Sequence, residues 1–116
     1  KKVTIHSVVS IEKAAFQECT SLTNVTIISF LSSIGEYAFQ GCSSLEQISI
    51  PSMPSNDEEA TSKLIGLCAF EGCSALKEIT IPFSTTSIGE NAFHNCSSIQ
   101  EIVIPSSVDS IASNAF

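Results

Sequence analysis

The feature that most constrains this chain is an Ala-Phe pair that returns at a nearly fixed interval. The phenylalanines of these pairs are separated by 23, 31, 23 and 23 residues, at Phe16, Phe39, Phe70, Phe93 and Phe116. The same phase is kept by a column of cysteines, Cys19, Cys42, Cys73 and Cys96. A fixed period of this length is typical of solenoids, in which each repeat packs only on its neighbours.

Each unit reads I-x-x-x-A-F-x-x-C-x-x-L-x-x-I-x-I, followed by a return that usually begins with proline. The last part alternates apolar and polar residues, as in Val25-Thr26-Ile27, and predicts one short strand per unit. Consecutive strands are expected to be parallel and about 4.8 Å apart. On the other side we expect a helical or irregular bend at the Ala-Phe pair, and a second short strand near 84–88 or 107–111.

The repeat predicts a single solenoid over residues 1–116. Its units span about 1–10 (partial), 11–33, 34–64, 65–87, 88–110 and 111–116 (partial). The spacing of 31 is 23 plus eight residues, which lie in the loop 51–64 and include two prolines and three consecutive acids. Solenoids need polar caps, and neither end of the chain carries one. We therefore expect a piece of a longer array, able to associate with itself end to end.

Composition argues against several partners. Five Lys plus Arg against twelve Asp plus Glu give a net charge of −7, whereas nucleic-acid binding depends on clustered cations. We expect no nucleic-acid partner. No run of 18 apolar residues occurs in the sequence, so no segment is expected to insert into a membrane.

The matched cysteines are interpreted as a buried column of free thiols. A disulfide needs Cβ atoms about 3.5–4.5 Å apart with a specific dihedral, whereas thiols on successive turns stay near the strand spacing of about 4.8 Å. Zinc is not expected, because a stacked column cannot surround an ion tetrahedrally. Cys68 lies off the column, and two interpretations stay open for it: a partly exposed, reactive thiol or a half-buried packing residue.

No catalytic, cofactor-binding or metal-binding residue is expected. His94 and Cys96 are residue types of a base and a nucleophile. Matched positions hold Gln17, Gln40 and Glu71, however, so His94 is interpreted as a variable exposed residue.

Two further patterns are interpreted as incidental. Asp57, Glu58 and Glu59 are read as a solvated cluster, because a flexible loop does not preorganise the ligands of a hard cation. Asn24 and Asn95 begin N-x-[ST] glycosylation acceptors, but both lie at repeat positions of a Ser/Thr-rich chain.

The strongest binding candidate is the set of strand side chains opposite the core, here called the strand face. It comprises Thr23, Asn24, Thr26, Glu46, Gln47, Ser49, Lys77, Glu78, Thr80, Gln100, Glu101 and Val103. This polar, acidic patch is smaller than the ~20–30 residues per side of a standard interface, so we expect weak binding strengthened by avidity. The alternative is a simple solvated sheet surface.

These motifs resemble the BspA-like (Treponema-type) leucine-rich repeats. Their 23-residue pattern I-G-x-x-A-F-x-x-C-x-S-L-x-x-I-x-I-P-x-S-V matches residues 88–108 almost throughout, and the resemblance covers the full chain. It implies an α/β leucine-rich repeat solenoid, a right-handed β-rich superhelix. The parallel sheet would form the concave face, with short strands or helical turns on the convex side. There are three departures: the eight-residue insert, a return one residue shorter between Ile5 and Ile11, and Ile28, which stands where other units have Pro51, Pro82 and Pro105.

The resemblance also implies a function. It predicts a non-enzymatic protein–protein interaction module of a cell-surface or extracellular protein, adhering to host or cell-surface proteins. Two alternatives stay open. A structural spacer in a larger surface protein would suit uniform ladders without aromatic hot spots, and a cytoplasmic scaffold would suit free thiols.

Overall fold

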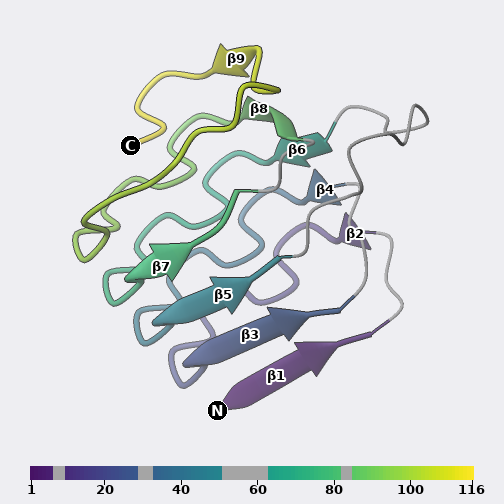
Figure 1. The fold of residues 1–116 in the computed structure, drawn as a ribbon. Coiled ribbons are helices and arrows are strands. Elements are labelled where there is room, and N and C mark those ends of the chain that lie inside the picture. The colour runs from purple at the N-terminus through teal and green to yellow at the C-terminus, as the bar shows by residue number, and fades with distance from the viewer. Residues whose placement is uncertain (7–9, 29–32, 51–62, 82–84) are drawn as a thin grey trace.

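The chain folds as a solenoid of stacked coils with two parallel sheets (Figure 1). The computed structural model describes residues 1–6, 10–28, 33–50, 63–81 and 85–116. Their envelope measures 37 × 31 × 24 Å. Coils follow one another because each repeat, of 23 residues or once of 31, brings the next strand beside the last.

The first sheet has the order β1-β3-β5-β7. Its strands are β1 (Lys2–Ile5), β3 (Asn24–Ile27), β5 (Gln47–Ser49) and β7 (Glu78–Ile79). Val25 is in register with Val3 and Ile48, so the apolar side chains of successive strands share one face. This confirms a parallel strand for these units. The expectation is wrong for the last unit, because residues 101–105 form no strand.

The second sheet has the order β2-β4-β6-β8-β9. Its strands are β2 (Ser10–Ile11), β4 (Ser33–Ile34), β6 (Lys63–Ile65), β8 (Thr85–Ile88) and β9 (Ser110–Ile111). The second short strands expected near 84–88 and 107–111 are confirmed as β8 and β9. The acids Asp57, Glu58 and Glu59 lie outside the described residues.

The Ala-Phe segments form turns, and no residue in the described ranges is helical. The α/β assignment is therefore unconfirmed; what is seen is a β-solenoid. Each turn places the residue two before its phenylalanine at positive φ, from Ala14 (58°) to Asn114 (55°). Backbone bonds link the turns of successive coils, as from Phe39 N to Ala69 O (2.8 Å).

The core is a set of columns that follow the solenoid axis. The phenylalanine rings stack with centroids 5.2 to 5.4 Å apart and nearly parallel planes. Phe39 and Phe70 are completely buried, as are Leu45 and Leu76. Repeated contacts of this kind hold each coil to the next, so the strand face is presented by a rigid base.

Candidate protein-binding face

Strands β3, β5 and β7 bring most of the strand face onto one surface. Backbone bonds fix the chain just before each strand: Thr23 N donates to Lys1 O (2.8 Å), Glu46 N to Thr23 O (2.8 Å) and Lys77 N to Glu46 O (3.0 Å). The next residues, Asn24, Gln47 and Glu78, point their side chains to the same side of the sheet, because the strands are parallel and in register.

A side-chain ladder crosses these strands. Asn24 Nδ2 donates to Gln47 Oε1 (3.3 Å), and Gln47 Nε2 donates to Glu78 Oε2 (3.3 Å). Beside it, Lys77 Nζ lies 3.2 Å from Glu46 Oε2. Exposed ion pairs of this kind contribute only about 0–1 kcal/mol. Their consequence is orientation: charges and amides are held in fixed places on the sheet.

The middle of the strand face is lined by small hydroxyl side chains. Thr26, Ser49 and Thr80 are all exposed on successive coils. A hydroxyl both donates and accepts hydrogen bonds. The face is therefore flat at its centre and able to bond a partner of either polarity.

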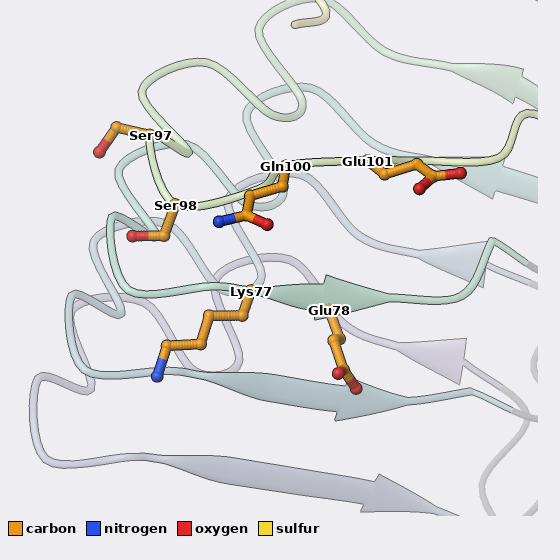
Figure 2. A pocket seen from close by; sticks show the side chains of 6 residues that line it. All are labelled: Lys77, Glu78, Ser97, Ser98, Gln100 and Glu101. Carbon is orange, nitrogen blue, oxygen red and sulfur yellow. The ribbon is translucent and has the colours of Figure 1, made fainter.

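The strand-face residues of the last unit depart from this arrangement. Gln100, Glu101 and Val103 were expected to extend the sheet, but Gln100 and Glu101 lie across an opening from β7 (Figure 2). Val103 is 68% exposed. The opening holds a hollow of about 600 Å³ lined by Lys77, Glu78, Ser97, Ser98, Gln100 and Glu101. Sequence reasoning missed Ser97 and Ser98, because the strand pattern of the last unit gives no sign of an opening.

The matched cysteines are free thiols. Cys42 and Cys73 are completely buried, as expected, whereas Cys19 and Cys96 are partly buried. Sequence reasoning treated them as small hydrophobic residues and missed a polar role. The Cys42 thiol donates to Phe16 O (3.1 Å), and the Cys73 thiol donates to Phe39 O (3.1 Å), each in the preceding coil. Burial raises the pKa of Cys42 to about 11.

Cys68 is neither exposed nor half-buried. It is 7% exposed and occupies the positive-φ turn position, with φ 54°. Burial raises the pKa of its thiol, and the nearby Glu71 carboxylate raises it further. Reactive cysteines have a lowered pKa and solvent access, so burial and the raised pKa favour the packing interpretation of Cys68.

His94 and Cys96 do not form an activated pair. The Cys96 thiol donates to Phe70 O (3.0 Å), and burial raises its pKa to about 11, the opposite of nucleophile activation. His94 is exposed, and its Nδ1 lies 3.8 Å from Glu71 Oε2. It thereby continues a second side-chain ladder, in which Gln17 Nε2 donates to Gln40 Oε1 and Gln40 Nε2 donates to Glu71 Oε1 (2.6 and 2.9 Å).

Within residues 1–6, 10–28, 33–50, 63–81 and 85–116, no group of three or more His, Cys, Asp and Glu side chains could hold a metal ion. Within the same ranges, no helix has the length and apolarity needed to cross a membrane.

Stacked parallel sheets, phenylalanine and cysteine columns and an exposed strand ladder define a leucine-rich repeat solenoid, a class whose members generally bind proteins. A family profile described as "BspA type Leucine rich repeat region" matches six copies over residues 1–116. The chain belongs to this family. No curated protein matches the sequence significantly.

Three solved structures have similar folds. A leucine-rich repeat protein of T. pallidum is 32% identical with a TM-score of 0.82, covering 97% of this chain and 52% of that one. A Bacteroides ovatus leucine-rich repeat protein is 37% identical (TM-score 0.79), covering 98% of this chain and 30% of that one. A leucine-rich cell surface protein of Faecalibacterium prausnitzii is 34% identical (TM-score 0.84), covering 100% and 30%. The chain thus spans about half or less of these proteins.

Proposed function

We propose that this chain is a non-enzymatic protein-binding module of a surface protein, which adheres to host or cell-surface proteins through the strand face. The observation that carries the proposal is the ordered ladder from Asn24 through Gln47 to Glu78, beside the exposed hydroxyls of the same strands. Polar groups held in place before binding lose little conformational entropy when a partner docks.

The proposed location rests on family membership and on one relative. The Faecalibacterium prausnitzii protein with a similar fold is described as a leucine-rich cell surface protein. Adhesins act in many copies, and multivalent display compensates for a small contact area. Weak binding by a single copy is therefore compatible with firm attachment.

The test replaces Thr26, Ser49 and Thr80 together with lysine and measures attachment of protein-coated fluorescent beads to cultured epithelial cells. Three lysines across the centre of the face would project long charged chains into the contact, so attachment should fall at least about tenfold, equivalent to 1.4 kcal/mol. Mild trypsin treatment of the cells should lower attachment of the unaltered protein if the receptor is a protein.

A matched control places three lysines elsewhere on the same coils, at Thr20, Ser43 and Ser74, which are also exposed. It has the same charge as the test variant, and its attachment should equal that of the unaltered protein. Equal attachment by the two lysine variants, both folded by circular dichroism, would refute the strand face as the binding surface.

A further inference from the structure

The first sheet stops at β7 although the coils continue. Backbone hydrogen bonds join successive coils of the first sheet, from Thr23 to Lys1, from Glu46 to Thr23 and from Lys77 to Glu46. Within the described part of the chain, no equivalent bond joins Gln100 to Lys77. The turns show no such break, because Phe93 N still donates to Ala115 O (2.7 Å). The second sheet also continues, from β8 to β9. The opening is therefore local to the first sheet.

Hydrogen bonds to the preceding coil hold the chain on both sides of the opening. On one side Ser98 Oγ donates to Ser74 O (2.6 Å). On the other, Ser107 Oγ donates to Thr85 O (2.7 Å), and Asp109 N donates to Thr86 O (2.8 Å). The chain between Ser98 and Ser107 is thus anchored at each end and separated from β7 in between. This geometry leaves a slot along the strand direction.

The slot has a polar half and an apolar half. Beside the polar hollow of about 600 Å³ is a second of about 420 Å³, lined by Ile79, Thr80, Ile81, Glu101, Val103 and Pro105. Glu101 lines both. Each volume falls within the roughly 300–1,000 Å³ of ligand sites. Strand-edge backbone next to an apolar hollow is the setting in which proteins bind an extended peptide as an added strand.

The charge at the slot is acidic. Lys77 and Glu78 lean toward β5, away from Gln100 and Glu101 (Figure 2), because Lys77 pairs with Glu46 and Glu78 accepts from Gln47. No hydrogen bond or ion pair within the described ranges engages the Glu101 carboxylate. An uncompensated carboxylate favours a cationic side chain from a partner.

We infer that this slot binds an extended peptide, which adds as a parallel strand beside β7 and presents a basic residue to Glu101, followed by an apolar residue over Ile79. The inference rests on the proposed protein-binding function and gives it a partner class: a basic, apolar-alternating segment. The peptide's backbone would bond the edge of β7, as β3 bonds β1.

The chain itself supplies a template for such a peptide. In β1, Lys2 pairs with Asn24 and Val3 pairs with Val25. Asn24 and Val25 occupy the positions that Glu78 and Ile79 hold in β7. A segment with the sequence of residues 1–5, KKVTI, would therefore place lysine beside Glu78 and valine beside Ile79.

The experiment measures fluorescence anisotropy of a labelled, terminally blocked KKVTI peptide. Two control peptides are EEVTI and KKVTI with N-methylated valine and isoleucine amides, which keep the side chains but cannot pair as a strand. Both should bind at least about tenfold more weakly, as expected when charge-assisted or backbone bonds are lost. Equal binding of the methylated peptide would overturn strand addition.

Two protein variants test whether Glu101 is part of the peptide-binding site. Glu101→Gln should weaken KKVTI binding about tenfold, and Glu90→Gln, an equal change of charge on an exposed turn, should leave it unchanged. Hydrogen exchange of the free protein should be fast at amides 101–104, slow at 24–27, and slowed at 101–104 by the peptide. Slow exchange at 101–104 in the free protein would overturn the inference. If KKVTI fails to bind while cell attachment still depends on Thr26, Ser49 and Thr80, the inference fails and the proposed function stands.

Discussion

The Sγ atom of Cys73 lies 3.1 Å from the carbonyl oxygen of Phe39, one coil earlier in the solenoid. The same oxygen also accepts from Cys42 N (3.2 Å), in the same coil as Phe39. The Cys73 thiol therefore adds a bond from the next coil to an acceptor that is already used. The cysteine column thus holds coils together by weak hydrogen bonds as well as by packing. This explains why a small, buried and unreactive thiol suits the position.

Cys73→Ala should lower the free energy of unfolding by about 1–3 kcal/mol, because it removes a buried sulfur atom and its hydrogen bond. Cys19→Ala is the matched control, since Cys19 is only partly buried. Cys19→Ala should lower the free energy of unfolding by less than half as much as Cys73→Ala. Urea unfolding followed by circular dichroism measures both, and equal losses would show that the column contributes nothing specific.

Alkaline pH should destabilise the fold through the same column. Burial raises the pKa of Cys42 from 9.0 to about 11. Between these values the unfolded chain loses the thiol proton while the folded chain keeps it. The folded state then binds more protons, and stability falls as pH rises, by about 1.4 kcal/mol per pH unit for each such thiol.

The measurement compares urea unfolding at pH 8 and pH 10.5 for the unaltered chain and for Cys42→Ala. Groups that titrate equally in both proteins cancel. The variant should lose less stability over this interval; an identical loss would mean that Cys42 ionises in the folded protein as easily as in the unfolded one.

The repeat made much of this fold predictable. Spacings of 23 and 31 residues put Val25, Ile48 and Ile79 in register, with their apolar side chains on one face of the sheet. The turn geometry was not predictable in the same way. Tyr37 and Cys68 share a positive-φ position, which no common residue type marks. Cys68 is buried at this position whereas Tyr37 is only partly buried, so the turn position alone does not decide burial.

The strand face, like the fold, was only partly predictable from the sequence. Residues 78–82 and 101–105 read Glu-Ile-Thr-Ile-Pro and Glu-Ile-Val-Ile-Pro, yet Glu78–Ile79 forms a strand whereas residues 101–105 form none. Local propensity predicts both segments equally well. Pairing depends on the non-local position of the neighbouring coil, which sequence alternation does not encode. The side-chain ladder at Asn24, Gln47 and Glu78 was predictable as a set of positions but not as a set of bonds.

The phenylalanine column should be more sensitive at its centre than at its end. Phe70 stacks on both Phe39 and Phe93, with centroids 5.2 and 5.3 Å away, and is completely buried. Phe70→Leu removes two aromatic pairs and should cost about 1–3 kcal/mol. Phe116 stacks on one ring and is 52% exposed, so Phe116→Leu should cost less than about 1 kcal/mol. A reversed order in thermal or urea unfolding would contradict a core organised around the ring stack.

Glycine is required where coils approach most closely. A Cβ added at Gly66 would lie 2.8 Å from Glu36 N and 2.8 Å from Gly35 C, both backbone atoms of the preceding coil. Those atoms cannot move without separating the coils. Gly66→Ala should therefore cost about 2–3 kcal/mol, in the upper part of the range for overpacked cores.

Gly72 provides the contrast, because its constraint is conformational. Its φ is +77°, but an added Cβ would meet Gly41 Cα at 3.7 Å, an ordinary contact. Asparagine tolerates this backbone region, and Asn95 adopts φ 62° at the equivalent position. Gly72→Asn should thus cost less than about 1 kcal/mol. Urea unfolding of both variants measures the difference; if Gly66→Ala proved as mild as Gly72→Asn, close coil packing would not be what holds glycine at position 66.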